Sequence, residues 1–588
     1  MQLKKQTKQL IIAAIILGTA YTPVFTSYVS AAEAPKAVKQ ETQVGKKLAY
    51  RQGQLLRTKY GLAKGAVVED TLVWQGLPYA KAPVGELRWR APQKPLAWQG
   101  IMDATKPGNM GIQGSLKKMQ GSEDCLNLDI HRPNTAQTNL PIMVYVHGGN
   151  NQKGDSSIPI ENFVKKADCV FVSINYRLGT LGFNNLPALH TGNKLEDSGN
   201  YAMLDIDEAL NWVKANAAAF GGNAKNVTIS GHSAGGRDVM AMLTSPLYKG
   251  KFQKAVSFCG GMTMSEVEPS QRIIANKLAV LAVQDNVKAN KQEAYKWLLT
   301  SDKSVRDYLY KLPANRLAAA FGGASIRMAP FPHLYADGYV LPKEQFATKK
   351  YNSVPLIMLA GTNEFSLYTT GDPYFRKYVA DKSLLTNKAM LDQFRFATKY
   401  GSRMYGYFNA EKSADDMFDN YHAPIYTCYV NYGNDPAVAG VEYATLFGAT
   451  HGIWEPILTG KDYWVAAKYP QSFNNNGARA LTDKMSAYFK NFLWTGNPNG
   501  AGLVPWDKWT SKTAGPTQLV FDADRDKAII TMTSTRTSYD SIIKALENDN
   551  SIPAAAKTKL ISSVLNGRWF SKALDTYFHN KDLWQVKN

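Results

Sequence analysis

The sequence predicts an α/β fold, with a large and mainly parallel central sheet flanked by helices. Residues 141–146 and 169–176 are almost continuously apolar over the length of a strand, which is typical of strands buried on both faces. Residues 204–220 form an amphipathic stretch, and a β-branched run at residues 227–229 follows it closely. Strand, helix and strand in this order favour parallel strands with helices on both faces of the sheet.

The remaining segments fit the same layered architecture. Residues 74–90 are rich in Gly, Pro and aromatic residues and predict a compact loop, whereas residues 122–130 alternate like a half-buried strand. A further buried strand is expected at residues 355–360. Helices are expected at residues 270–320, 373–421, 481–494 and 538–588. The first two helical insertions are candidates for the walls of a substrate cleft, and added scaffolding is an equal alternative.

Length and composition place the chain among large folded proteins. It has 588 residues, of which 45% are hydrophobic and 11% aromatic, so it can bury a sizeable core and is not intrinsically disordered. The formal net charge of +20 favours anionic surfaces, but lysine and arginine are scattered and no nucleic-acid-binding motif is present. We therefore expect no nucleic-acid partner, and we interpret the charge as a property of solubility or envelope association.

The N-terminus has the pattern of a secretory signal peptide. Lysines precede an apolar run at residues 10–17, and small residues end the segment near Ala31. We expect a signal peptide over residues 1–31, a secreted or periplasmic protein with one domain over residues 32–588, and no transmembrane span after cleavage. A retained membrane anchor is the alternative, which the shortness of the apolar run disfavours.

The four cysteines are far apart in the sequence. Their spacing matches neither a zinc site nor a disulfide scaffold. We expect no metal and no organic cofactor.

A serine in a tight turn is the candidate nucleophile. Residues 231–235 read Gly-His-Ser-Ala-Gly, the G-x-S-x-G pattern that holds a serine between a strand and a helix. The β-branched run at 227–229 precedes it, and residues 237–243 can form the helix. This pattern nominates Ser233.

A serine hydroxyl needs a base, and the base needs an acid that orients it. Four histidines follow Ser233, and His451 is favoured because it lies in a loop of small residues. Glu364 is the candidate acid because it follows the strand at 355–360, and Asp337 is the competitor.

The oxyanion formed during acyl transfer needs backbone N–H donors. One is the residue after the nucleophile, Ala234, and the others come from a glycine-rich loop after an early strand. Residues 147–150, which read His-Gly-Gly-Asn, supply such a loop.

Together these residues resemble the type-B carboxylesterase and cholinesterase family of the α/β-hydrolase superfamily. The resemblance covers about residues 60–525. It rests on residues 76–80, 87–89, 122–126, 146–149, 175–179, 199–201, 220–223, 231–235, 361–364, 451–452 and 496–498. It implies Ser233 as nucleophile, Glu364 as acid, His451 as base, and N–H donors from Gly149, Asn150 and Ala234.

Several positions depart from the family pattern. Asn150 replaces a third glycine, and His232 replaces the usual glutamate before the serine. Asparagine tolerates left-handed backbone, so the oxyanion loop can survive this exchange. Glu364 comes earlier after its glycine than the family spacing G-x-N-x-x-E places the acid, which keeps Asp337 open as an alternative.

Two further departures concern the loop before residue 125. Gly111 lies where the family has a cysteine, so the resemblance implies no disulfide to Cys125. Lys117 and Lys118 stand in place of an aromatic residue, so choline esters are not expected as substrates.

The sequence therefore predicts a carboxylic-ester hydrolase that acts on a small-molecule ester through an acyl-enzyme. A lipase for long acyl chains is the alternative among enzymes. A non-catalytic binding protein of the same fold is the alternative in another class. The natural ester, the oligomeric state and the role of residues 538–588 stay open.

Overall fold

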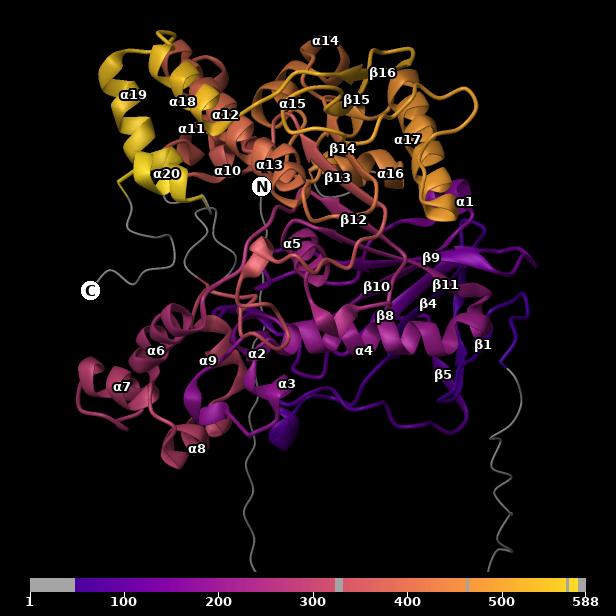
Figure 1. The fold of residues 1–588 in the computed structure, drawn as a ribbon, viewed down its shortest axis with the longest axis vertical. Coiled ribbons are helices and arrows are strands. Elements are labelled where there is room, and N and C mark those ends of the chain that lie inside the picture. Colours follow the sequence, from indigo (N-terminus) through magenta and orange to yellow (C-terminus); the bar gives the residue numbers. More distant parts are fainter. Residues whose placement is uncertain (1–47, 323–330, 462–464, 567–570, 580–588) are drawn as a thin grey trace, which may run out of the picture. The chain divides into compact units, whose positions relative to one another are not determined.

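An eleven-stranded sheet runs through the computed structural model (Figure 1), which describes residues 48–322, 331–461, 465–566 and 571–579. From one edge to the other its strands are β16 (Ala528–Thr533), β15 (Gln518–Ala523), β14 (Ile425–Val430), β13 (Leu356–Gly361), β12 (Lys254–Phe258), β11 (Gly222–His232), β9 (Leu140–Val146), β10 (Val170–Ile174), β8 (Asn127–Pro133), β4 (Thr71–Pro78) and β3 (Ala66–Val68). The strands from β10 to β15 pair in parallel, and the strands at both edges pair antiparallel. The predicted α/β class is confirmed.

Strand β9 shows why its sequence has no alternation. Ile142, Val144 and Val146 point into one buried cluster, whereas Met143 and Tyr145 join a second cluster on the opposite face. Both faces of the strand are therefore covered, and a polar residue at either parity would be buried without partners.

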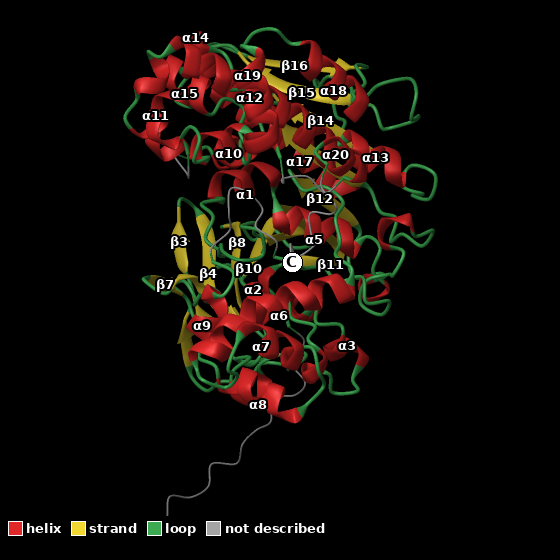
Figure 2. Ribbon diagram, turned by 90° about the vertical axis from the view of Figure 1, so that its left-hand side faces the viewer, coloured by secondary structure: helices red, strands yellow, loops and turns green. Residues whose placement is uncertain are grey.

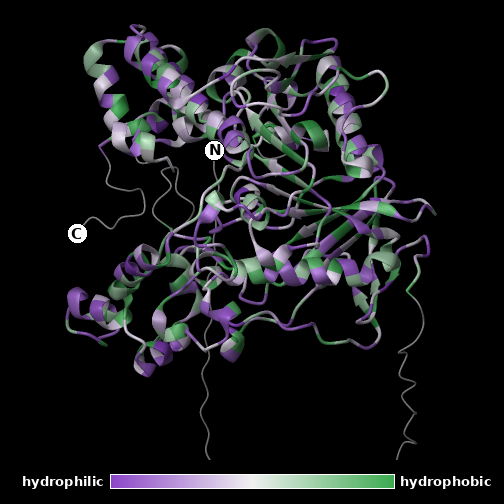
Figure 3. Ribbon diagram, viewed as in Figure 1, coloured by the Kyte–Doolittle hydropathy of each residue, from purple (hydrophilic) through white to green (hydrophobic). Residues whose placement is uncertain are grey.

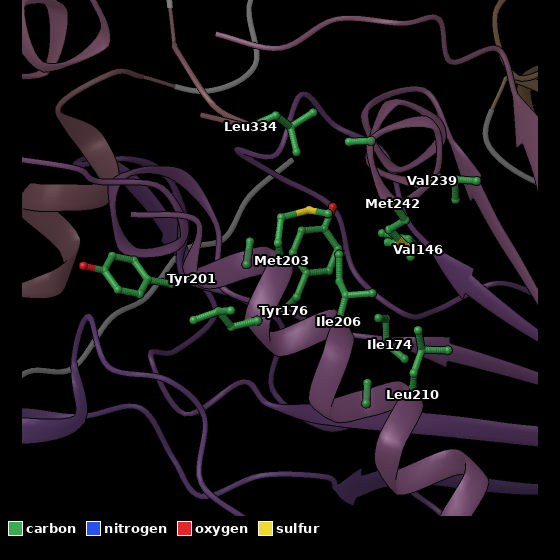
Figure 4. Close-up of a cluster of buried hydrophobic side chains, with 14 of the residues drawn as sticks. Val146, Ile174, Tyr176, Tyr201, Met203, Ile206, Leu210, Val239, Met242 and Leu334 are labelled. Atoms are coloured by element: carbon green, nitrogen blue, oxygen red, sulfur yellow. The ribbon is translucent and has the colours of Figure 1, made fainter. Parts of the chain in front are cut away.

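Helices cover the two faces of the sheet. Helix α4 (Tyr201–Asn216) and helix α5 (Ala234–Met242) pack on the first face, and helices α1 (Glu161–Ala167), α16 (Trp454–Thr459) and α17 (Asn476–Thr495) pack on the second. Figure 4 shows side chains of the first face. Those labelled there are Val146, Ile174, Tyr176, Tyr201, Met203, Ile206, Leu210, Val239, Met242 and Leu334. In Figure 3 the central strands are mainly apolar, whereas α4 carries both apolar and polar residues, as expected of a helix with one buried face.

The helical insertions lie outside the sheet (Figure 2). Those after β12 are α6 (Val267–Gln284), α7 (Lys291–Leu298), α8 (Lys303–Lys311) and α9 (Ala314–Ala319). Those after β13 are α10 (Ser366–Gly371), α11 (Arg376–Ala380), α12 (Lys388–Asn409) and α13 (Glu411–Met417). The helices α18 (Tyr539–Asn548), α19 (Ala554–Leu560) and α20 (Lys572–Tyr577) share a buried cluster with α12.

Three predicted elements differ in the structure. The compact loop expected at residues 74–90 begins inside strand β4 and contains a 3₁₀ turn at Gly85–Leu87. The half-buried strand expected at residues 122–130 is instead β8, which begins at Asn127 and is buried on both faces. Polar side chains produce the apparent alternation, and they are hydrogen-bonded inside: Asp129 accepts from Gly76 N at 2.8 Å and from Ser156 Oγ at 2.8 Å. The helix expected at 204–220 ends at Asn216, and a 3₁₀ turn completes it.

The described residues from Leu48 onward form one compact unit. The predicted signal peptide and the first residues of the predicted domain lie outside the described residues. Among the described residues, no helix is both long and apolar enough to cross a bilayer. All four cysteines are buried as free thiols.

Candidate active site

Ser233 lies in a strained turn between the end of β11 and the start of α5. Its φ of 57° and ψ of −115° fall outside the regions that ordinary residues occupy. The turn is anchored on both sides, because Ser233 N donates to Phe258 O at 2.8 Å and Ser233 O accepts from Arg237 N at 3.0 Å. Strand, turn and helix are thus arranged as the G-x-S-x-G pattern predicts.

The glycines of the pattern allow the backbone to fold this tightly. A Cβ atom on Gly231 would lie 2.2 Å from the carbonyl oxygen of Gly235, and one on Gly235 would lie 2.1 Å from that of Val146. Both contacts are too short for any side chain. The two glycines are therefore required by the close approach of the helix to the sheet.

A cavity of about 780 Å³ opens at this turn. Ser233, His451 and the loop at residues 147–150 all contribute to its lining, together with Arg237. Residues that are far apart in the sequence thus meet around one space, which has the size of a small-molecule binding site.

His451 lines this cavity and is paired with the buried Glu364. Glu364 Oε2 lies 2.5 Å from His451 Nδ1, and Glu364 Oε1 accepts from Gly361 N at 2.6 Å. The Glu364 side chain is completely buried and that of His451 is 4% exposed. Because both carboxylate oxygens have donors, the acid is fixed and orients the imidazole.

The second ring nitrogen of His451, Nε2, is the one that a base acting on Ser233 would use. Nε2 is buried and has no hydrogen-bond partner in the described part of the chain, and no hydrogen bond joins it to Ser233. Catalytic hydrogen bonds in unliganded enzymes are often formed only with substrate present. The structure thus brings Ser233 and the His451–Glu364 pair to one cavity without a direct bond between them.

Asp337 lies in a different hydrogen-bond network. Its carboxylate accepts from the backbone N–H groups of residues 339, 340 and 341 and from the side chain of Asn200. This is the pattern of an aspartate that holds a turn. Glu364, despite its unusual spacing, is the acid that contacts His451.

The candidate oxyanion donors are unpaired. The N–H groups of Gly149, Asn150 and Ala234 have no hydrogen-bond partner among the described residues. Gly149 has φ 97° and Asn150 φ 58°, so the loop takes the left-handed backbone that the sequence suggested. Ala234 is buried, where unpaired backbone donors are rare, and Gly149 and Asn150 are half-buried at the cavity, so the three N–H groups favour binding of an acceptor.

His232 contacts the candidate base directly. Its ring centroid lies 4.8 Å from that of His451, and its Nδ1 accepts from Trp454 Nε1 at 3.1 Å. Burial, reinforced by the neighbouring His451, lowers the pKa of His232 well below the ordinary value. His232 is therefore a neutral hydrogen-bond acceptor. Trp454 was missed by sequence reasoning, since only the fold brings it to His232.

Cys259 lies beside Glu364 and His451, and all three side chains are of types that can bind a metal ion. One ligand atom from each of Cys259, Glu364 and His451 lies within 4.8 Å of the others. Burial, and then the Glu364 carboxylate, raises the pKa of the Cys259 thiol well above its ordinary value. A protonated thiol is a poor metal ligand and can donate to Glu364. The donor set fits a hydrogen-bonded acid better than a metal site.

Comparisons with known proteins identify the family of this chain. A family model described as "Carboxylesterase family" matches residues 52–422. Para-nitrobenzyl esterase of Bacillus subtilis (strain 168) is 38% identical over 242 residues, which are 40% of this chain and 49% of that protein. Carboxylesterase 1D of Rattus norvegicus is 30% identical over 499 residues, covering 76% of this chain and 84% of that protein.

Solved structures show the same relationship. A structure titled PNB esterase superposes with a TM-score of 0.63 at 27% identity, covering 83% of this chain and 99% of that one. The Geobacillus stearothermophilus carboxylesterase EST55 at pH 6.2 gives a TM-score of 0.61 at 26% identity, covering 84% and 99%. The family model and the relatives aligned over most of both chains confirm the resemblance, and we conclude that this chain belongs to the carboxylesterase family of carboxylic-ester hydrolases.

Proposed function

We propose that this protein hydrolyses small carboxylic esters through an acyl-enzyme on Ser233. The observation that carries the proposal is the buried His451–Glu364 pair, 2.5 Å apart, whose His451 lines the same cavity as the strained Ser233. Serine nucleophile, imidazole base and orienting carboxylate are the three groups that this chemistry needs.

In the first half of the reaction, Ser233 Oγ attacks the carbonyl carbon of the ester while His451 Nε2 takes the hydroxyl proton. The oxyanion accepts hydrogen bonds from the N–H groups of Gly149, Asn150 and Ala234. The bond to the alcohol oxygen then breaks, and His451 gives its proton to the departing alkoxide. Glu364 holds the imidazole in the correct orientation and stabilises it while it is charged.

In the second half, water replaces the alcohol. His451 takes a proton from the water as it attacks the acyl-enzyme, and the C–O bond to Ser233 breaks. The carboxylic acid leaves, and Ser233 Oγ regains its proton from His451.

The first experiment compares two serines of the same turn and strand. Ser233→Ala should abolish hydrolysis of a 4-nitrophenyl ester and labelling by a fluorophosphonate probe. Ser230→Ala is the matched control, because Ser230 Oγ is buried and donates to Val144 O away from the cavity. Equal rates for wild type and Ser233→Ala would refute the mechanism, and a wild-type protein that resists labelling would favour a non-catalytic binding role.

A series of 4-nitrophenyl esters of increasing acyl length gives the substrate range. Maximal kcat/KM with short acyl chains is the result expected of an esterase. A maximum with long chains, together with activation at an emulsion surface, would instead identify a lipase.

We also propose that residues 1–31 are removed on export to the periplasm or the medium. The support is the order of lysines, apolar run and small residues at the N-terminus. The intact mass of the protein purified from the culture medium or periplasm should begin at residue 32. An uncleaved chain found only in the cytoplasm would contradict the proposal.

A further inference from the structure

Asn150, which replaces a glycine of the oxyanion loop, has both ends of its side-chain amide bound. Its Oδ1 accepts from Arg237 Nη2 at 2.9 Å, and its Nδ2 donates to Gln152 Oε1 at 2.8 Å. Arg237 belongs to the first turn of α5, directly after Ser233, and only 2% of it is exposed. The side chain at position 150 therefore links the oxyanion loop to the helix that carries the nucleophile.

The next residue makes a parallel link. Asn151 Nδ2 donates to Asp238 Oδ1 at 2.8 Å, and Asn151 Oδ1 accepts from Tyr176 Oη at 2.9 Å. Asn151 is fully buried and also has a left-handed backbone, with φ 54°. Two consecutive asparagines of the loop thus bind two consecutive residues of α5.

This arrangement has a physical reason. Left-handed backbone costs most residues with a Cβ atom about 1–2 kcal/mol, and asparagine tolerates it better than most. Glycine tolerates it better still, so two consecutive asparagines in this conformation are helped to keep the loop's shape by the contacts of their side chains. A cavity-lining N–H group that moves by a fraction of an ångström no longer points at the oxyanion. The helix α5 is a suitable anchor because it starts at the nucleophile itself.

We propose that Arg237 is a positioning residue for the oxyanion loop. Its hydrogen bond to Asn150 holds the loop in position relative to Ser233. The inference rests on the proposed function of Ser233 and goes beyond it. The loop of this chain depends on a side-chain contact where a glycine would need none. Arg237 acts through Asn150, and its effect is on kcat and not on substrate affinity.

A double-mutant cycle tests this dependence. Arg237→Met should lower kcat by about 10- to 100-fold with KM nearly unchanged, since losing an oxyanion donor outright costs about 10² to 10³. In an Asn150→Gly background, the same substitution should lower kcat by less than about threefold, because glycine adopts the left-handed backbone without help. Arg237→Lys, which keeps a donor, should recover part of the loss.

A control and a second variant complete the experiment. Arg90→Met removes an arginine paired with Glu196 outside the cavity, and kcat should not change in either background. Asn150→Ala keeps a Cβ but loses the amide, so its kcat should be about tenfold below that of Asn150→Gly, even if Arg237→Met fails to fold.

The outcomes separate the two proposals. Equal losses from Arg237→Met in both backgrounds, or a rise in KM instead of a fall in kcat, would overturn the positioning role. Equal kcat values for Asn150→Ala and Asn150→Gly would overturn it as well. Failure of the proposed function would appear differently, as wild-type protein that neither hydrolyses the ester nor reacts with a fluorophosphonate.

Discussion

Glu364 and Asp337 have similar chemistry but lie in different hydrogen-bond networks, and one substitution at each distinguishes them. Glu364→Gln should lower kcat by about 10⁴-fold with little change in KM, because an amide no longer fixes the imidazole tautomer. Asp337→Asn should keep kcat, since Asp337 binds backbone N–H groups of its own turn. Steady-state kinetics on a 4-nitrophenyl ester measures both, and the reverse ranking would assign the acid to Asp337.

His232 should act on stability through Trp454. His232→Phe keeps an aromatic ring beside His451 but leaves the buried Trp454 N–H without its acceptor, so the free energy of unfolding should fall by about 1–3 kcal/mol. His232→Asn restores an acceptor and should lose less. Denaturant unfolding monitored by fluorescence compares them. If His232→Phe abolished hydrolysis as completely as Ser233→Ala, His232 and not His451 would be the base.

Glu455 gives the stability a pH dependence. It is buried in the cavity wall, and burial raises its pKa from 4.5 to about 8. The folded protein therefore binds more protons than the unfolded chain between these values. The stability linked to this group is fully present below pH 4.5 and is lost as the pH rises through 8.

Glu455→Gln should remove this loss. Between about pH 5 and pH 9, the free energy of unfolding of the variant should fall less than that of wild type, by up to about 4 kcal/mol. Chemical denaturation at both pH values measures the difference. The exposed Glu547→Gln is the control, and identical pH profiles for wild type and Glu455→Gln would contradict the expectation.

At the scale of secondary-structure elements, the C-terminal helices pack against α12, which in turn contacts the loop that carries Glu364. Ile542 and Leu546 of α18 are buried in one cluster with residues of α12, and Tyr400 Oη donates to Asp549 at 2.6 Å. Helix α12 in turn supports Phe365, the residue after Glu364, whose N–H donates to Ser402 Oγ at 3.0 Å. The C-terminal segment is thus packed into the fold.

Leu546→Ala should therefore destabilise the protein by about 2–5 kcal/mol, because it leaves a cavity between α18 and α12. Lys544→Ala, on the exposed side of the same helix, should change the free energy of unfolding by less than about 0.5 kcal/mol. Thermal or denaturant unfolding measures both. Equal stability of the two variants would show that α18 does not contribute to the core.

A buried strand is recognised from its sequence only when it carries few polar side chains with partners in other segments. β9, β10 and β13 are recognisable because strands covered on both faces need apolar residues at every position. β8 is equally buried but carries Asp129, His131 and Arg132 as partnered polar residues, so its pattern imitates a half-exposed strand. The partners come from distant segments, which a local pattern does not contain.

For the whole molecule, the net charge of +20 should affect how substrates arrive. The charged groups described in the cavity lining are Lys153, Arg237, Lys468, Asp155 and Glu455. Because Glu455 is protonated below its pKa of about 8, positive charge prevails there at neutral pH. Such a field attracts anionic ligands and is screened by salt.

An ester that bears a carboxylate should therefore be more sensitive to salt than a neutral one. Between about 20 and 500 mM NaCl, kcat/KM for 4-nitrophenyl hemisuccinate should fall several-fold, whereas that for 4-nitrophenyl butyrate should change by less than about twofold. Parallel assays at neutral pH compare the two esters. An equal response of both would show that the field does not steer substrate.

The sequence alone determined the α/β class and predicted the strained turn that holds Ser233, because strand periodicity and glycine-dependent turns are encoded in neighbouring residues. It also narrowed the proposed base and acid to a few positions. Tertiary structure decided which acid meets His451, what His232 accepts, and how Arg237 holds Asn150. These contacts join residues 87 and 222 positions apart. Their geometry depends on how the helices close over the sheet, which no local pattern specifies.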